Sequence, residues 1–152
     1  MAAEIRGAAG RPRSARLRAP LLITLWIALG FEAAGGLVIF CARLLSGSSP
    51  GVTLHVAVGL VLTLLYAAYQ WSHWRRVAPL RARLDYALGL IASSSLAITQ
   101  ASGLALGWIW WRSPAAPVYP ASLSALHNIM SMLVLTFVLA HLGAVLTRDS
   151  RR

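Results

Sequence analysis

Acidic residues and lysine are scarce in this 152-residue chain, which contains four aspartates and glutamates in total and no lysine. Charged residues make up only 12% of the sequence, whereas 58% of the residues are hydrophobic and the mean hydropathy is +0.67. A soluble domain of this size cannot bury so much apolar surface, so we expect a membrane protein. The acidic residues are too scattered to form paired catalytic carboxylates: Glu4, Glu32, Asp85 and Asp149.

Cysteine occurs once, at Cys41. A single cysteine cannot form an internal disulfide, and without a C-x-x-C-H motif no haem can be attached covalently in the c-type manner. We interpret Cys41 as a small apolar residue of a membrane segment. Phosphate-binding loops, nucleophile triads and hydrolytic zinc motifs are also missing, so the sequence does not indicate a hydrolytic enzyme.

Four apolar stretches, at 20–41, 52–71, 86–110 and 121–146, are each about as long as the ~20 residues needed to cross a membrane. Backbone amides in lipid must be satisfied internally, so these stretches should be helices. The connections are short, so successive helices should run in opposite directions. The sequence therefore predicts an all-α, integral membrane four-helix up-down bundle at 20–146, flanked by basic tails at 1–19 and 147–152.

All 14 basic residues are arginine, and all but Arg43 and Arg112 fall in the two tails or in the loop between the second and third stretches. With four crossings these three regions share one side, so the positive-inside rule predicts that both termini are cytoplasmic, in a bacterial inner membrane. The net charge of +10 then sets the orientation of the chain in the membrane. The same arginines can also contact anionic membrane lipid. We expect no nucleic-acid partner.

The four histidines occupy two of the stretches, with His55 and His73 in the second and His127 and His141 in the fourth. Helices two apart along the chain run parallel, so His55 should lie near His127 at the outer surface, and His73 near His141 at the inner one. A spacing of 14 residues on the fourth helix, or 18 on the second, spans ~21 or ~27 Å and keeps each pair on one face. Neutral imidazole is a good ligand of haem iron, and bundle cores hold such cofactors.

Three short segments and one further histidine carry a resemblance to a known family: His55-Val-Ala-Val-Gly59, His73-Trp74-Arg75-Arg76, Leu126-His127-Asn128 and His141. They resemble the four-helix membrane b-type cytochromes, which include the cytochrome b subunits of formate dehydrogenases and hydrogenases and related small quinone-linked proteins. The resemblance implies two b-type haems held by paired histidines. It also implies electron transfer between a quinone and a redox partner subunit, either a periplasmic oxidoreductase or a multihaem cytochrome.

By that resemblance, His55 and His127 would ligate an outer haem, and Gly59 would let the haem plane approach the helix backbone. The chain departs from the family pattern at Tyr69, which stands where a second histidine is expected, and His73 follows one turn later. The outer pair therefore rests on the stronger pattern. For His73 an interfacial role beside the tryptophans stays open, so one or two haems are expected.

Haem propionates are anionic and need cations near the membrane surface. Arg75 and Arg76 could serve the inner haem, and Arg43 or Arg112 the outer one. Positive-inside charge alone would also explain Arg75 and Arg76.

Glu32 lies near the middle of the first apolar stretch, where a carboxylate costs about 2–3 kcal/mol. It could accept a proton from a quinol and act as a proton relay. Alternatively, it could tie helices together by bonding Gln100, Ser94 or a histidine. The neighbouring Gly35 and Gly36 indicate close packing of this helix against another helix or a cofactor.

Two functions from other classes stay open. The chain could be a haem-free accessory subunit of a larger respiratory or photosynthetic complex, with histidines that only stabilise it. It could also be a small transporter or proton pathway that uses Glu32 and the histidines as relay groups. The uninterrupted apolar runs at 60–65 and 133–139 disfavour a water-filled route.

Overall fold

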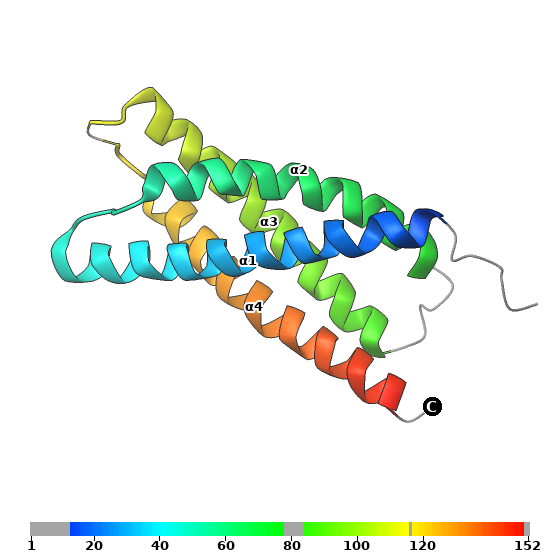
Figure 1. Ribbon diagram of the computed structural model, residues 1–152. Helices are drawn as coiled ribbons and strands as arrows, with labels where there is room; N and C mark the ends of the chain where they lie inside the picture. Colours follow the sequence, from blue (N-terminus) through cyan, green and yellow to red (C-terminus); the bar gives the residue numbers. More distant parts are fainter. Residues whose placement is uncertain (1–12, 78–83, 116, 151–152) are drawn as a thin grey trace, which may run out of the picture.

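A computed structural model describes the backbone of residues 13–77, 84–115 and 117–150, and the side chains of 20–75, 84–115 and 117–147. These residues form four α-helices and short connections (Figure 1). The helices are α1 (Arg13–Ser46), α2 (Val52–Val77), α3 (Leu84–Arg112) and α4 (Ala121–Ser150). The all-α prediction is confirmed, and the starts of α2 and α4 coincide with the predicted ones.

Each helix contains a segment long and apolar enough to cross a membrane: Pro20–Ser46, Val52–Arg75, Leu84–Arg112 and Ala121–Thr147. The apolar side chains mostly point outward rather than into a core. Leu45 is 88% exposed and Trp111 is 68% exposed, whereas the buried apolar residues are few. Such a distribution is expected where lipid, not water, surrounds the helices, because lipid is as apolar as the side chains themselves. The chain thus has the features of a multi-pass membrane protein.

The helices are longer than the apolar stretches because they continue into the polar flanks, where the backbone still bonds to itself. The turn after α1 is set by two glycines in the left-handed region, Gly47 at φ 70° and Gly51 at φ 73°. The Gly47 N–H donates to the Arg43 carbonyl over 3.1 Å and closes α1, while the Gly51 carbonyl accepts from the His55 N–H and begins α2. Positive φ at a helix end is the conformation that glycine adopts without steric cost.

The helices associate mainly as two pairs, α3 with α4 and α1 with α2, and a smaller contact between α2 and α3 joins the pairs. The buried face of α3 consists largely of small residues: Ala92, Ser95, Leu96, Ser102 and Gly107. Small side chains let helix backbones approach closely in a membrane, where no hydrophobic force drives association. The two pairs are therefore tightly packed internally, and more room is left between them.

The α2–α3 contact contains one polar and one steric feature. The Thr63 hydroxyl donates to Oε1 of Gln100 over 2.7 Å, and it also lies 2.7 Å from the Gly59 carbonyl of its own helix. Further along, a Cβ at Gly107 would lie 3.2 Å from the Val56 side chain. The absence of a side chain at Gly107 thus lets α3 lie close to Val56 of α2.

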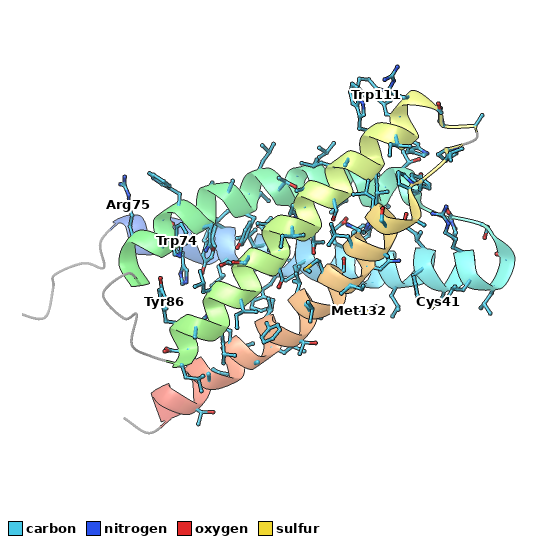
Figure 2. The ribbon with its side chains drawn as sticks, turned by 180° about the vertical axis from the view of Figure 1, so that it is seen from behind. Cys41, Trp74, Arg75, Tyr86, Trp111 and Met132 are labelled. Atoms are coloured by element: carbon cyan, nitrogen blue, oxygen red, sulfur yellow. The ribbon has the colours of Figure 1, made fainter. Side chains whose placement is uncertain are left out.

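Trp74 and Arg75 lie at one end of the bundle and Trp111 and Cys41 at the other (Figure 2). Arg75 lies over the ring of Trp71 at 4.7 Å from the ring centre, and Trp108 packs edge-on against Trp111 at 5.4 Å. Aromatic residues at both ends of membrane helices are typical of the two membrane–water interfaces.

We expect Thr63→Val to lower the free energy of unfolding by about 0.6 kcal/mol, and by no more than about 1.7 kcal/mol, the range for hydrogen bonds between membrane helices. The substitution preserves shape but removes the donor to Gln100. Reversible unfolding in detergent measures the change. Thr136→Val is the matched control, because the Thr136 hydroxyl bonds only the Met132 carbonyl of its own helix. Equal effects of the two substitutions would contradict a role for the α2–α3 bond.

Candidate functional site

The structure brings together His55 and His127, which lie near the starts of α2 and α4. Their ring centres are 6.4 Å apart and the ring planes are almost perpendicular, at 82°. Both side chains are partly buried. The predicted proximity of His55 and His127 is thus present in the fold.

His127 is oriented by α3. Its Nδ1 lies 3.1 Å from the Thr99 carbonyl and 3.2 Å from the Ser102 hydroxyl. A carbonyl oxygen only accepts, so Nδ1 must carry the ring proton. The Ser102 hydroxyl oxygen can also accept a hydrogen bond from this N–H, because its own hydrogen is directed to the Ile98 carbonyl at 2.8 Å. With Nδ1 protonated, the neutral ring presents Nε2 as its electron-pair donor.

His55 is contacted by Glu32 from α1, with 2.9 Å between Nδ1 and Oε2. The two side chains are 21% and 13% exposed, respectively. The atoms are close but not aligned as a hydrogen bond, and Oε1 of Glu32 is buried with no hydrogen-bond partner among the described residues. The contact agrees with one of the three partners suggested for Glu32 by the sequence, a histidine. Gln100 bonds Thr63 instead, and a proton-relay role for Glu32 stays a prediction.

Glycines surround this pair where the helices come closest. A Cβ at Gly36 would lie 3.4 Å from Cε1 of His55, and one at Gly35 would lie 3.7 Å from its Nδ1. A Cβ at Gly59 would lie 3.3 Å from Oε2 of Glu32. The predicted close packing around Gly35 and Gly36 is therefore against the His55 ring, and the space beside Gly59 is taken by the Glu32 carboxylate.

A cavity of about 1300 Å³ opens between the two helix pairs and receives residues from all four helices. Its lining is mainly apolar but includes His55, His127 and Glu32. Besides Oε1 of Glu32, two further polar atoms of the lining are buried without a hydrogen-bond partner in the described part of the chain, namely Nδ1 of His55 and the hydroxyl of Thr99. Pockets for drug-sized ligands are usually about 300–1,000 Å³, so this cavity suits a large, mainly apolar ligand with a few polar contacts.

Arg43, rather than Arg112, supplies the cation at this cavity. Arg43 lines both the large cavity and an adjoining pocket of about 310 Å³, and it lies over the ring of Tyr119 at 4.8 Å from the ring centre. Burial raises the pKa of the Tyr119 hydroxyl, an effect that the Arg43 charge opposes. Arg112 is exposed and is not part of either lining.

The other two histidines, His73 and His141, have separate partners. Nδ1 of His141 lies 2.7 Å from the Asp85 carbonyl of α3. His73 is stacked on Tyr69, one turn earlier in α2, with 5.3 Å between ring centres and 3.3 Å between Nδ1 and the Tyr69 hydroxyl. Neither histidine lines the large cavity. Arg75 lies near this end of α2 (Figure 2), and the Arg76 side chain lies outside the described residues.

Sequence reasoning missed the groups that orient the histidines, namely Thr99, Ser102 and Gly103. These residues belong to the polar and glycine-containing part of α3 and were visible in the sequence. Serines and glycines are common in membrane helices, however, so their presence does not show which side chain they contact. Within the described ranges no cluster of three or more histidine, cysteine or acidic side chains could hold a metal ion. A haem iron needs only two such side chains, since its macrocycle supplies the other ligands.

The chain has no match among models of protein families, curated proteins or solved structures. Its function is therefore inferred from the contacts around the four histidines.

We expect Glu32→Leu and His55→Phe to be energetically coupled by about 0.5–3 kcal/mol, the range for residues in direct polar contact. Each single change leaves the other polar group buried without its partner, whereas the double change removes both. Unfolding of the four proteins in detergent measures the coupling. The control cycle pairs Glu32→Leu with His141→Phe, since His141 contacts α3 near Asp85. Additive effects of Glu32→Leu and His55→Phe would show that the 2.9 Å contact contributes nothing.

Proposed function

We propose that this protein is a membrane electron-transfer subunit, a b-type cytochrome in which His55 and His127 ligate a haem. The observation that carries the proposal is the pair of neighbouring, nearly perpendicular imidazoles, 6.4 Å apart between ring centres, at a largely apolar cavity of about 1300 Å³. The alternative of a haem-free accessory subunit has no specific observation in its favour and is an outcome of the test below.

The spacing of the two rings fits a metal between them. Bonds from imidazole nitrogen to a metal are about 2.0–2.1 Å, so His55 and His127, with 6.4 Å between ring centres, are close enough for both to bind one metal. The Nδ1 contacts fit as well, because a histidine that ligates a metal usually donates its other N–H to a carbonyl or carboxylate. The Thr99 carbonyl is such an acceptor for His127, and the Glu32 carboxylate lies 2.9 Å from Nδ1 of His55, close enough to become one after a small reorientation.

When bound, a haem supplies one-electron oxidation and reduction. The chain's own residues would orient it and exclude water. Apolar lining side chains would pack on the macrocycle, and Arg43 would pair with its propionates at the mouth of the cavity. The four helices would hold the two imidazoles in fixed positions, which limits the rearrangement that accompanies each electron transfer.

A second haem between His73 and His141 belongs to the same proposal. Arg75 and Arg76 would serve its propionates, as the resemblance to di-haem cytochromes implies. Two haems near opposite surfaces would carry electrons across the membrane, which changes the free energy by about 2.3 kcal/mol per charge for each 100 mV.

The proposed setting is the bacterial inner membrane. The helices would form an up-down bundle with both termini in the cytoplasm, because the arginines concentrate in the two tails and in the loop between α2 and α3. The connections are too short to hold a catalytic domain. The chain would therefore pass electrons between a quinone and a partner subunit, either a periplasmic oxidoreductase or a multihaem cytochrome.

The decisive experiment is a dithionite-reduced minus oxidised absorption spectrum of the purified chain, with haem quantified per polypeptide. We expect non-covalent b-type haem that is lost at the outer site in His55→Leu and in His127→Leu. His73→Ala reports on the inner site: two haems that fall to one support the full assignment, while a single haem that survives restricts binding to the outer pair. A folded chain that takes up no haem, even with haemin added, would overturn the cytochrome and favour the accessory subunit.

Arg43→Gln should weaken haem binding at the outer site about tenfold or more, because a charge-assisted bond contributes roughly 1.5–3 kcal/mol. Titration of the haem-free chain with haemin measures the affinity. Arg112→Gln is the matched control, since Arg112 is the other arginine of the outer connections and does not line the cavity. A larger loss in Arg112→Gln than in Arg43→Gln would assign the propionate contact to Arg112 instead.

A further inference from the structure

Helix α3 carries no histidine, yet it contacts both histidines of α4. At the outer end, Nδ1 of His127 lies 3.1 Å from the Thr99 carbonyl. One turn further along α3, a Cβ at Gly103 would lie only 3.0 Å from Cε1 of the same ring. The ring thus lies against bare helix backbone, with its Nδ1 directed at a carbonyl.

The same arrangement recurs at the inner end. Nδ1 of His141 lies 2.7 Å from the Asp85 carbonyl. One turn further along α3, a Cβ at Gly89 would lie 2.9 Å from Cε1 of that ring and 3.1 Å from its Nδ1. Real Cβ atoms essentially never come within 3.0 Å of another heavy atom, so only glycine leaves room for the ring in this position.

Each histidine of α4 thus meets one carbonyl and one glycine of α3, which together form a glycine–carbonyl unit. The two units are related by a shift along the α3–α4 pair. His127 and His141 are 14 residues apart on α4, and Gly103 and Gly89 are 14 residues apart on α3. Since the helices run in opposite directions, the outer histidine meets the later glycine and the inner histidine meets the earlier one. A spacing of 14 residues is ~21 Å of rise and nearly four turns, which returns both side chains to the same interface.

We propose that α3 is the positioning helix of the bundle: its two glycine–carbonyl units hold His127 and His141 in the same tautomer, with Nδ1–H donated to α3 and Nε2 left as the metal ligand. The proposal rests on the proposed function, in which these histidines bind haem. In this arrangement Nε2 of His141 is available to bind a metal in the same way as Nε2 of His127. The proposal also makes Gly89 and Gly103 positioning residues, although neither provides a ligand atom.

The tautomer follows from chemistry. A backbone carbonyl has no hydrogen to donate, so a short contact with Nδ1 requires the proton on Nδ1. The rest of the ring then carries its lone pair on Nε2. An N–H bond to a carbonyl also raises the basicity of the ligating nitrogen and fixes the ring orientation, and loss of such a partner typically costs 10–100-fold in metal affinity.

The first test is independent of haem. Nitrogen-15 NMR of histidine-labelled, haem-free chain in detergent distinguishes a protonated Nδ1 from a protonated Nε2, with His127→Leu and His141→Leu used to assign the signals. We expect both α4 histidines as the Nδ1–H tautomer. Nε2–H as the main form of either ring would overturn the proposal for that ring, whether or not the chain binds haem.

The second test is haem affinity, measured by haemin titration, together with the reduced-minus-oxidised spectrum. Gly103→Ala should weaken the outer site and Gly89→Ala the inner site, each by about 10–100-fold, and each should convert the tautomer signal of its own histidine only. Gly143→Ala is the matched control, because a Cβ there meets nothing within 4 Å. Equal effects of the three substitutions, or an inner site unaffected by Gly89→Ala, would overturn the positioning role.

The outcomes separate the two proposals. Absence of haem with both histidines as Nδ1–H tautomers would refute the cytochrome but leave α3 as the helix that orients them. If an alanine variant does not fold by circular dichroism, the NMR measurement on the wild-type chain decides alone.

Discussion

The structure depends on one constraint: a polar side chain between membrane helices can be satisfied only by other parts of the protein. The four histidines and Glu32 are among the most polar groups of the spans, and each has a polar contact inside the bundle. Since these partners come largely from neighbouring helices, the histidine contacts determine which helix faces meet. On α3 the rings of His141 and His127 lie so close to the backbone that a Cβ at Gly89 or Gly103 would come to 2.9 or 3.0 Å from them.

The division into two helix pairs follows from the same contacts. In α3 and α4 the rings of His127 and His141 fit against glycines, so the helices pack closely along their length. In α1 and α2 the corresponding contact is between His55, Gly36 and Glu32. The pairs meet each other through fewer contacts, and the cavity of about 1300 Å³ lies between them. A cofactor that bridges α2 and α4 would join the pairs, so its binding and the assembly of the bundle would stabilise each other.

Most of the fold and part of the site could be predicted from the sequence. The four apolar stretches identified the helices, because membrane-spanning length is a property of the chain alone. The pairing of His55 with His127 followed from the parallel course of alternate helices. The hydrogen-bond partners of His127 and His141 could not be predicted. These partners are the backbone carbonyls of Thr99 and Asp85, and every residue has such a carbonyl, so no side-chain pattern identifies them. The choice of Arg43 over Arg112 at the cavity likewise depended on the turn between α1 and α2 and on the position of Tyr119.

The sequence by itself determined that four helices form and which residues able to ligate a metal lie on each, because local composition and spacing decide these properties. Only the tertiary structure decided which nitrogen of His127 and His141 is engaged, which glycines receive their rings, and that Glu32 contacts His55 rather than Gln100. These features depend on the relative rotation and closeness of neighbouring helices. Both are set by the packing of side chains from separate parts of the chain, so no single stretch of sequence specifies them.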